Sequence, residues 1–215
     1  MIIIAITGQL ATGKSTITQL AKQMGFKVFD SDKSVHNLLK TREVKREINN
    51  FFNFKVKNLF KENGEINNEK LGSYVFKNNS GLKKLEEILH PRVRKKERMF
   101  LENCCINRIK FVFLDIPLLN ETSQGKRCDF IISMFVRKHI QKLRASRRNM
   151  SCNRIEAIIK KQERLKRVLY SEFLVRINSG NGKFFVKKKL IKFMNLVKKK
   201  KTNKVWPNHY KLNVK

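Results

Sequence analysis

A loop motif near the N-terminus constrains the fold of this 215-residue chain more than any other feature. The segment from Gly8 to Ser15 matches G-x-x-x-x-G-K-[ST]. Glycines at these positions let the backbone wrap around phosphate oxygens, and successive N–H groups form an anion nest. The apolar run Ile2 to Thr7 precedes the loop, and an amphipathic helical pattern, Thr16 to Met24, follows it. This strand–loop–helix order predicts a nucleotide phosphate site.

Two side chains of the loop have defined tasks in such a site. We expect Lys14 to reach the β- and γ-phosphates of ATP and the Ser15 hydroxyl to ligate Mg²⁺. The residues predicted to contact the nucleotide are Gly8, Ala11, Thr12, Gly13, Lys14, Ser15 and Thr16.

Two aspartates follow the next apolar run. Lys27 to Phe29 is predicted to be a short strand that ends at Asp30 and completes a βαβ unit. Asp30 and Asp32 then lie at the carboxyl edge of a parallel sheet, beside the phosphate loop. A carboxylate there accepts a proton from a hydroxyl, orients that hydroxyl, or caps the following helix. We assign the chemistry to Asp32 and a capping or supporting role to Asp30.

The rest of the chain has the pattern of an α/β protein with an insertion. Residues 33–108 are helical in pattern, and His90-Pro91 is predicted to end or redirect a helix there. Further strands are expected at 109–114, which ends at Asp115, at 130–136 and at 173–177. Helices are predicted over 138–148, over 151–170 with Ser151 as N-cap, and from Val186 to Val197.

Composition limits the class of protein and its compartment. No apolar run is long enough for a membrane span, and we identify no signal peptide. The four cysteines form no C-x-x-C pair, which favours reduced thiols in a cytoplasmic protein over a disulfide or zinc framework. The formal net charge of +32 attracts polyanions in general. Because the excess is spread along the chain and comes mainly from Lys, we attribute it to compositional drift and expect no specific nucleic-acid partner.

Three segments together resemble one enzyme family. They are the phosphate loop, Asp30-Ser31-Asp32, and Asp115-Ile-Pro117-Leu118-Leu119-Asn-Glu121. In this order and spacing they resemble the dephospho-CoA kinases, and weaker matches extend the resemblance from about residue 1 to about 197. The resemblance implies a P-loop kinase-like three-layer α/β sandwich with a parallel five-stranded sheet. It also implies a core of residues 1–32 and 109–197, a lid at about 138–165, a helical acceptor-binding insertion of 33–108, and a basic tail of 198–215.

The resemblance also implies a reaction and roles for single residues. ATP with Mg²⁺ would phosphorylate the ribose 3′-hydroxyl of dephospho-CoA, giving CoA and ADP in the last step of coenzyme A biosynthesis. Asp32 would be the base or orienting group, with Lys14 and Arg147 also catalytic. Arg148 would bind the nucleotide, although a solvated helix face is an equal alternative for the arginine-rich segment from Arg144. Asp115 would organise Mg²⁺ through water or anchor the following turn. The residues implied for the acceptor are Thr7, Asp30, Asp32, His90, Pro117, Leu118 and Leu119.

Two alternatives to this function remain open from the sequence. A nucleoside monophosphate kinase would share the fold and the lid and differ only in the acceptor pocket. A nucleic-acid-binding ATPase is the less favoured alternative, since no base-reading or stacking motif accompanies the charge. One loop position departs from the family, because Ala11 stands where glycine is usual. That change is mild provided that the backbone at Ala11 does not need a positive φ.

Overall fold

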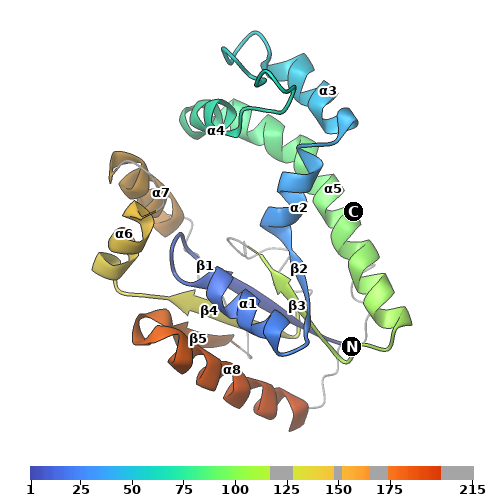
Figure 1. The fold of residues 1–215 in the computed structure, drawn as a ribbon, viewed down its shortest axis with the longest axis vertical. Coiled ribbons are helices and arrows are strands. Elements are labelled where there is room, and N and C mark those ends of the chain that lie inside the picture. Colours follow the sequence, from blue (N-terminus) through green and yellow to red (C-terminus); the bar gives the residue numbers. More distant parts are fainter. Residues whose placement is uncertain (117–127, 148–151, 165–173, 200–215) are drawn as a thin grey trace. The chain divides into compact units, whose positions relative to one another are not determined.

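The computed structural model describes residues 1–116, 128–147, 152–164 and 174–199 (Figure 1). The chain forms two compact units. The first consists of Met1–Asp30 together with the chain from Asn103 onward, and the second is Ser31–Glu102. The sequence patterns predict this division at residues 33 and 108.

A five-stranded sheet forms the centre of the first unit, with the strand order β2-β3-β1-β4-β5. Every neighbouring pair is parallel, so the predicted five-stranded parallel sheet of an α/β fold is confirmed. The buried faces of the inner strands explain their continuous apolar runs. The strands are β1 (Ile2–Gly8), β2 (Lys27–Asp30), β3 (Phe111–Asp115), β4 (Phe130–Phe135) and β5 (Leu174–Asn178).

The strand register brings the predicted functional positions to one edge of the sheet. Asp115, at the end of β3, pairs with Ile6 of β1 on one side and with Asp30 of β2 on the other. Gly8, at the end of β1, pairs with Met134 of β4. Because parallel strands end at the same edge, the phosphate loop, Asp30 and Asp115 all begin from one rim of the sheet.

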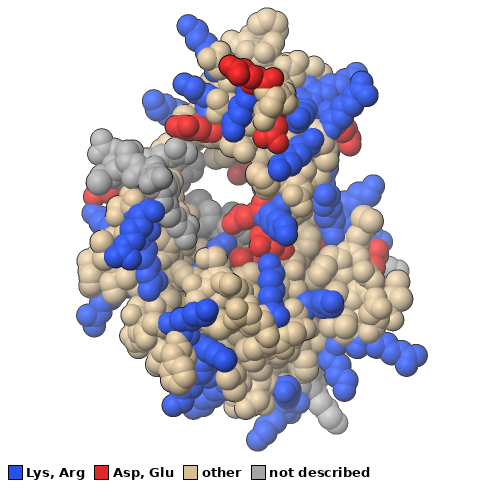
Figure 2. Space-filling view, viewed as in Figure 1, with Lys and Arg blue, Asp and Glu red and all other residues tan. Residues whose placement is uncertain are grey.

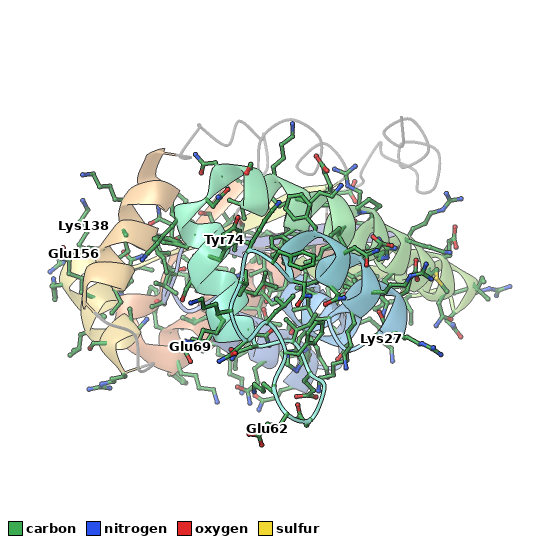
Figure 3. All side chains as sticks on the ribbon, turned by 90° about the horizontal axis from the view of Figure 1, so that it is seen from above. Lys27, Glu62, Glu69, Tyr74, Lys138 and Glu156 are labelled. Atoms are coloured by element: carbon green, nitrogen blue, oxygen red, sulfur yellow. The ribbon has the colours of Figure 1, made fainter. Side chains whose placement is uncertain are left out.

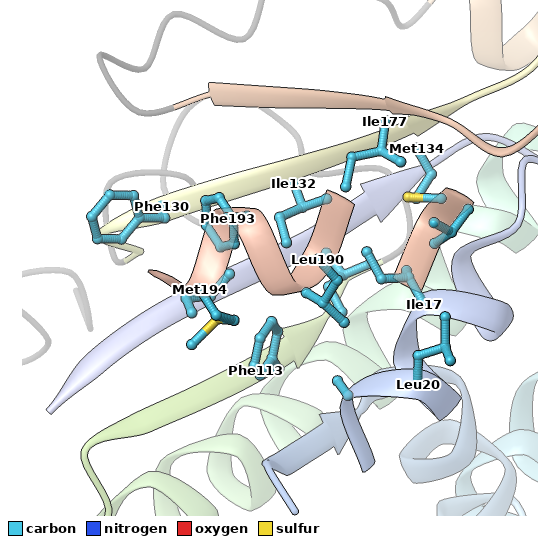
Figure 4. Packing of buried hydrophobic residues seen from close by; sticks show 14 of the residues in the cluster. Ile17, Leu20, Phe113, Phe130, Ile132, Met134, Ile177, Leu190, Phe193 and Met194 are labelled. Carbon is cyan, nitrogen blue, oxygen red and sulfur yellow. The ribbon is translucent and has the colours of Figure 1, made fainter. Parts of the chain in front are cut away.

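Helices α1 (Lys14–Gln23) and α8 (Gly182–Lys199) cover one face of this sheet (Figures 1 and 4). Their apolar sides meet the strands in a single buried cluster, in which Phe130 and Phe193 pack edge to face with ring centroids 5.9 Å apart. The cluster anchors α1, and with it the loop that α1 follows. The buried side chains labelled in Figure 4 are Ile17, Leu20, Phe113, Phe130, Ile132, Met134, Ile177, Leu190, Phe193 and Met194.

Two further helices of the first unit occupy the predicted lid region. They are α6 (Lys138–Ser146) and α7 (Cys152–Arg164). An ion pair joins them on the outside, with Lys142 Nζ 2.5 Å from Glu156 Oε1, and this hydrogen bond holds the pKa of Glu156 below its ordinary value. The predicted N-cap Ser151 lies outside the described residues. A short 3₁₀ helix, η2 (Ser179–Asn181), links β5 to α8.

The second unit consists of helices α2 (Ser31–Leu38), α3 (Arg42–Phe52), α4 (Asn68–Lys77) and most of α5 (Asn79–Ile106). It has an apolar core of its own, in which Phe52 of α3 and Tyr74 of α4 pack edge to face with centroids 6.0 Å apart. Tyr74 lies among these helices, whereas Glu62, in the turn between α3 and α4, projects outward (Figure 3).

The prediction that His90-Pro91 ends a helix is wrong. Helix α5 continues through Pro91 for its full 28 residues. The next residue, Arg92, supports this turn, because its guanidinium donates to the carbonyl oxygen of Ile88 at 2.7 Å. The carbonyl that loses its helical N–H donor is that of Glu87, four residues before Pro91. Arg92 also binds Glu43 and Glu47 of α3, and these hydrogen bonds, Glu43 first, raise its pKa. Tertiary contacts therefore outweigh the local preference of proline.

Lysine and arginine side chains are scattered over the visible face rather than gathered in one patch (Figure 2). In the part of the chain that the structure describes, no helix combines the length and the apolar character that crossing a bilayer demands.

Candidate active site

Close packing around Gly8 and Gly13 shapes the phosphate loop. A Cβ atom on Gly8 would lie 2.6 Å from Thr12 Oγ1 and 2.9 Å from the Met134 carbonyl oxygen. A Cβ atom on Gly13 would lie 2.8 Å from the Cβ of Ser179, and Gly13 also has a φ of +91°. No side chain fits at either position. The two glycines of the motif are therefore required by space, and Gly13 by backbone conformation as well.

The lysine of the motif pairs with the aspartate at the end of β3. Lys14 Nζ lies 3.2 Å from Asp115 Oδ1, and Thr18 Oγ1, one helical turn further along α1, donates to Asp115 Oδ2 at 2.7 Å. All three side chains are largely buried. Asp115 thus holds the ammonium group of Lys14 at the sheet edge. An anion with more negative charge than one carboxylate would attract this ammonium group more strongly than Asp115 does.

Ala11 adopts a left-handed backbone conformation, with a φ of +57°. The condition under which alanine would be a mild replacement for glycine is therefore not met. An L-residue in this region carries a steric cost of roughly 1–2 kcal/mol. The methyl group partly offsets that cost because it is buried, at 5% exposure, against Ala145 of α6 and against Ile155 and Ile159 of α7.

We expect Ala11→Gly to change the free energy of unfolding by less than about 1 kcal/mol, because relief of strain opposes the lost burial of a methyl group and the greater freedom of the unfolded chain. Ala11→Val should destabilise the protein by about 2 kcal/mol or more, since a β-branched residue resists this conformation. Urea unfolding of both variants measures the difference. A valine variant as stable as the wild type would contradict the positive φ.

Arg144 of α6 binds protein groups beside the loop. Its Nη1 donates to Ser179 Oγ at 2.7 Å and its Nη2 donates to the Ser179 carbonyl oxygen at 3.0 Å. Ser179 in turn lies against Gly13. In the sequence, function and a solvated helix face were equal alternatives for this arginine-rich segment. In the structure Arg144 links the turn after β5 to the phosphate loop, so its guanidinium is not part of a solvated helix face.

The remaining predicted residues are distributed over both units. Asp30 ends β2 and lies near Lys22 of α1, with Nζ 3.7 Å from Oδ2. Thr7 is buried near the end of β1, and Arg147 is exposed directly after α6. Asp32 on α2 and His90 on α5 belong to the second unit, where both are exposed. Predictions for Pro117, Leu118, Leu119, Glu121 and Arg148 lie outside the described residues.

Oxygen donors are available for a cation near the loop. The Ser15 side chain is exposed in the first turn of α1, and the Asp115 carboxylate already binds one positive charge. Mg²⁺ prefers such ligands and usually keeps several waters. This donor set therefore fits the ion, while no cluster of three or more His, Cys, Asp or Glu forms a protein-only metal cage among the described residues.

Three residues at the site were not predicted from the sequence. Thr18 bonds Asp115, Ser179 bounds Gly13, and Gln141 of α6 donates to the Leu10 carbonyl oxygen at 2.8 Å. The sequence carried a signal for Thr18, because its spacing of four residues from Lys14 places both on one face of α1.

A parallel sheet whose first strand leads into a glycine-rich, lysine-bearing loop and a buried helix defines a P-loop kinase-like fold. Comparison with known proteins specifies the family. The family model described as dephospho-CoA kinase matches residues 2–182, so the chain belongs to the dephospho-CoA kinase family.

Individual relatives agree with this assignment. A dephospho-CoA kinase of Bartonella henselae is 40% identical over 152 residues, which cover 70% of this chain and 75% of the relative. One of Agrobacterium fabrum is 34% identical over 187 residues, covering 85% and 91%. The solved structure of dephospho-CoA kinase from Campylobacter jejuni has a TM-score of 0.62 and 27% identity, covering 91% of this chain and 98% of the other.

Proposed function

We propose that this protein transfers the γ-phosphoryl group of ATP to the ribose 3′-hydroxyl of dephospho-CoA, giving CoA and ADP. The single observation that carries the proposal is the loop lysine Lys14 held on Asp115 at the sheet edge, in a chain whose residues 2–182 match this family. In the reaction, the 3′-oxygen forms a bond to the γ-phosphorus, the bond from that phosphorus to the bridging oxygen breaks, and ADP leaves with the electron pair.

Lys14 exchanges one anionic partner for another when ATP binds. Its ammonium group moves from Asp115 to the β- and γ-phosphate oxygens, while the N–H groups of the loop and of the first turn of α1 surround the phosphates. Ser15 would hold Mg²⁺, with Asp115 acting through water. When bound, that ion neutralises charge that develops on the phosphate oxygens.

Asp32 is our candidate for the group that receives the hydroxyl proton or orients the hydroxyl. It follows β2 by two residues and carries an exposed carboxylate in the first turn of α2. Asp30 supports the end of β2 through Lys22. Arg147 and Arg148 follow α6 and would bind the oxygens of the transferring phosphoryl group. Thr7, His90 and Pro117–Leu119 stay proposals for the acceptor site. Because the donor is ATP, we propose the cytoplasm as the place of reaction.

A coupled assay that follows ADP release tests the function. Purified protein is incubated with ATP, Mg²⁺ and one acceptor at a time: dephospho-CoA, AMP, CMP or a nucleoside. We expect turnover with dephospho-CoA and formation of CoA in equal amount to ADP, with the other acceptors near background. Turnover of a nucleoside monophosphate without turnover of dephospho-CoA would refute the substrate and favour the alternative kinase.

A further inference from the structure

Both peptide groups of one loop residue, Leu10, are bound by glutamine side chains from two different helices. The Leu10 N–H donates to Gln162 Oε1 of α7 at 2.9 Å, and Gln141 Nε2 of α6 donates to the Leu10 carbonyl oxygen at 2.8 Å. Gln141 is almost fully buried, at 3% exposure. The two amide orientations are unambiguous, because an N–H group only donates and a carbonyl oxygen only accepts.

An apolar contact supports the same junction. Leu10 and Ala11 pack against Ala145 of α6 and against Ile155 and Ile159 of α7. The tip of the phosphate loop is thus enclosed by the two lid helices through hydrogen bonds and buried surface together. Both hydrogen bonds are part-buried, so water replaces a lost partner less readily there than at an exposed position.

The same helix carries the arginines of the site. Arg144, on the turn of α6 that follows Gln141, binds Ser179 beside Gly13, and Arg147 follows the end of α6. The contacts that hold α6 on Leu10 therefore also position Arg144 and Arg147 relative to the phosphate loop.

We propose that Gln141 and Gln162 are positioning residues for the nucleotide: together they hold the loop tip in its phosphate-binding shape and seat the lid helices on it. They act through Leu10 and are not catalytic residues. The inference rests on the proposed kinase function only for its kinetic part, since nucleotide binding can be measured without any acceptor.

The polarity of the two bonds provides a matched test. Gln141→Glu and Gln162→Glu add the same negative charge to the same junction, with opposite effects on hydrogen bonding. The Gln141→Glu variant places a carboxylate against the Leu10 carbonyl oxygen, whereas the Gln162→Glu variant keeps an acceptor for the Leu10 N–H. We expect Gln141→Glu to weaken binding of a fluorescent ATP analogue about 10-fold or more, and Gln162→Glu to weaken it less than about 3-fold. Lys160→Gln, an equal charge change at an exposed position of α7, is the control.

Gln162→Leu tests the second hydrogen bond, the one from the Leu10 N–H. It also replaces Gln141→Glu as the test if that variant does not fold. It removes the acceptor without adding charge, so we expect a loss of about 10-fold that Gln162→Glu does not show. Thermal unfolding measured in parallel identifies a purely structural role, which would lower the melting temperature but leave the affinity of the folded protein unchanged. In steady-state assays, KM for ATP should rise while KM for dephospho-CoA stays within about 2-fold.

Equal losses in the two glutamate variants, or wild-type affinity in both Gln141→Glu and Gln162→Leu, would overturn the proposal. Failure of the proposed function has a different signature: the wild-type protein would then bind the ATP analogue but leave dephospho-CoA unchanged.

Discussion

Replacing Lys14 with alanine is expected to lower kcat/KM with dephospho-CoA by about 100-fold or more, the range for losing one preorganised electrostatic contact to a transition state. The reason is that Lys14 is the cation held at the sheet edge for the β- and γ-phosphates. The coupled assay measures the loss. Lys187→Ala, which removes an exposed lysine of α8, should keep wild-type activity and controls for the change in net charge.

The Lys14 variant needs one further control, because Asp115 loses its partner as well. The Asp115 carboxylate is buried, and only the bond from Thr18 remains among those described above. We expect Lys14→Ala to fold with stability reduced by about 1–3 kcal/mol. Adding Asp115→Asn should recover part of that stability without restoring activity. If the double variant regained wild-type turnover, Lys14 would have no direct role in transfer.

Asp32→Asn is expected to lower kcat by about 100- to 10,000-fold, the usual contribution of a positioned acid–base group. Asparagine has nearly the same size, and Asp32 is exposed in the first turn of α2, so the fold should remain intact. Affinity for the ATP analogue should stay within about 2-fold of the wild type, because the carboxylate is assigned to the acceptor.

Asp30→Asn is the matched comparison for Asp32→Asn. Asp30 ends β2 and binds Lys22, so we expect a smaller loss from its replacement. Near wild-type turnover in Asp32→Asn would show that its assigned role is wrong. A larger loss in Asp30→Asn than in Asp32→Asn would transfer that role to Asp30.

Local sequence patterns predicted the centre of the fold well. The β1 strand, the phosphate loop and α1 follow from an apolar run, a glycine–lysine motif and a helical stripe that all point to the same structure. The strand order, in contrast, could not be predicted from local patterns. It depends on which strands pair across crossovers, and the order β2-β3-β1-β4-β5 came from the structure rather than from periodicity.

Long-range contacts explain what sequence reasoning could not predict. Pro91 was expected to interrupt α5, but Arg92 binds both Ile88 of its own helix and two glutamates of α3. Gln141 and Gln162 bind the backbone of a residue more than a hundred positions away. A side chain that binds a distant peptide group requires no particular residue type at the partner position, because every residue carries the same peptide group. Such a contact therefore produces no recognisable residue pattern.

The contact between Gly13 and Ser179 joins two distant positions into one constraint on residue size. A larger residue at position 13 or at position 179 would require a smaller residue at the other position. Gly13 has no side chain to reduce and Ser179 is nearly as small, so neither position has room for a larger side chain. Bulky substitutions at position 179 should therefore impair nucleotide binding from a turn that carries no recognised phosphate motif.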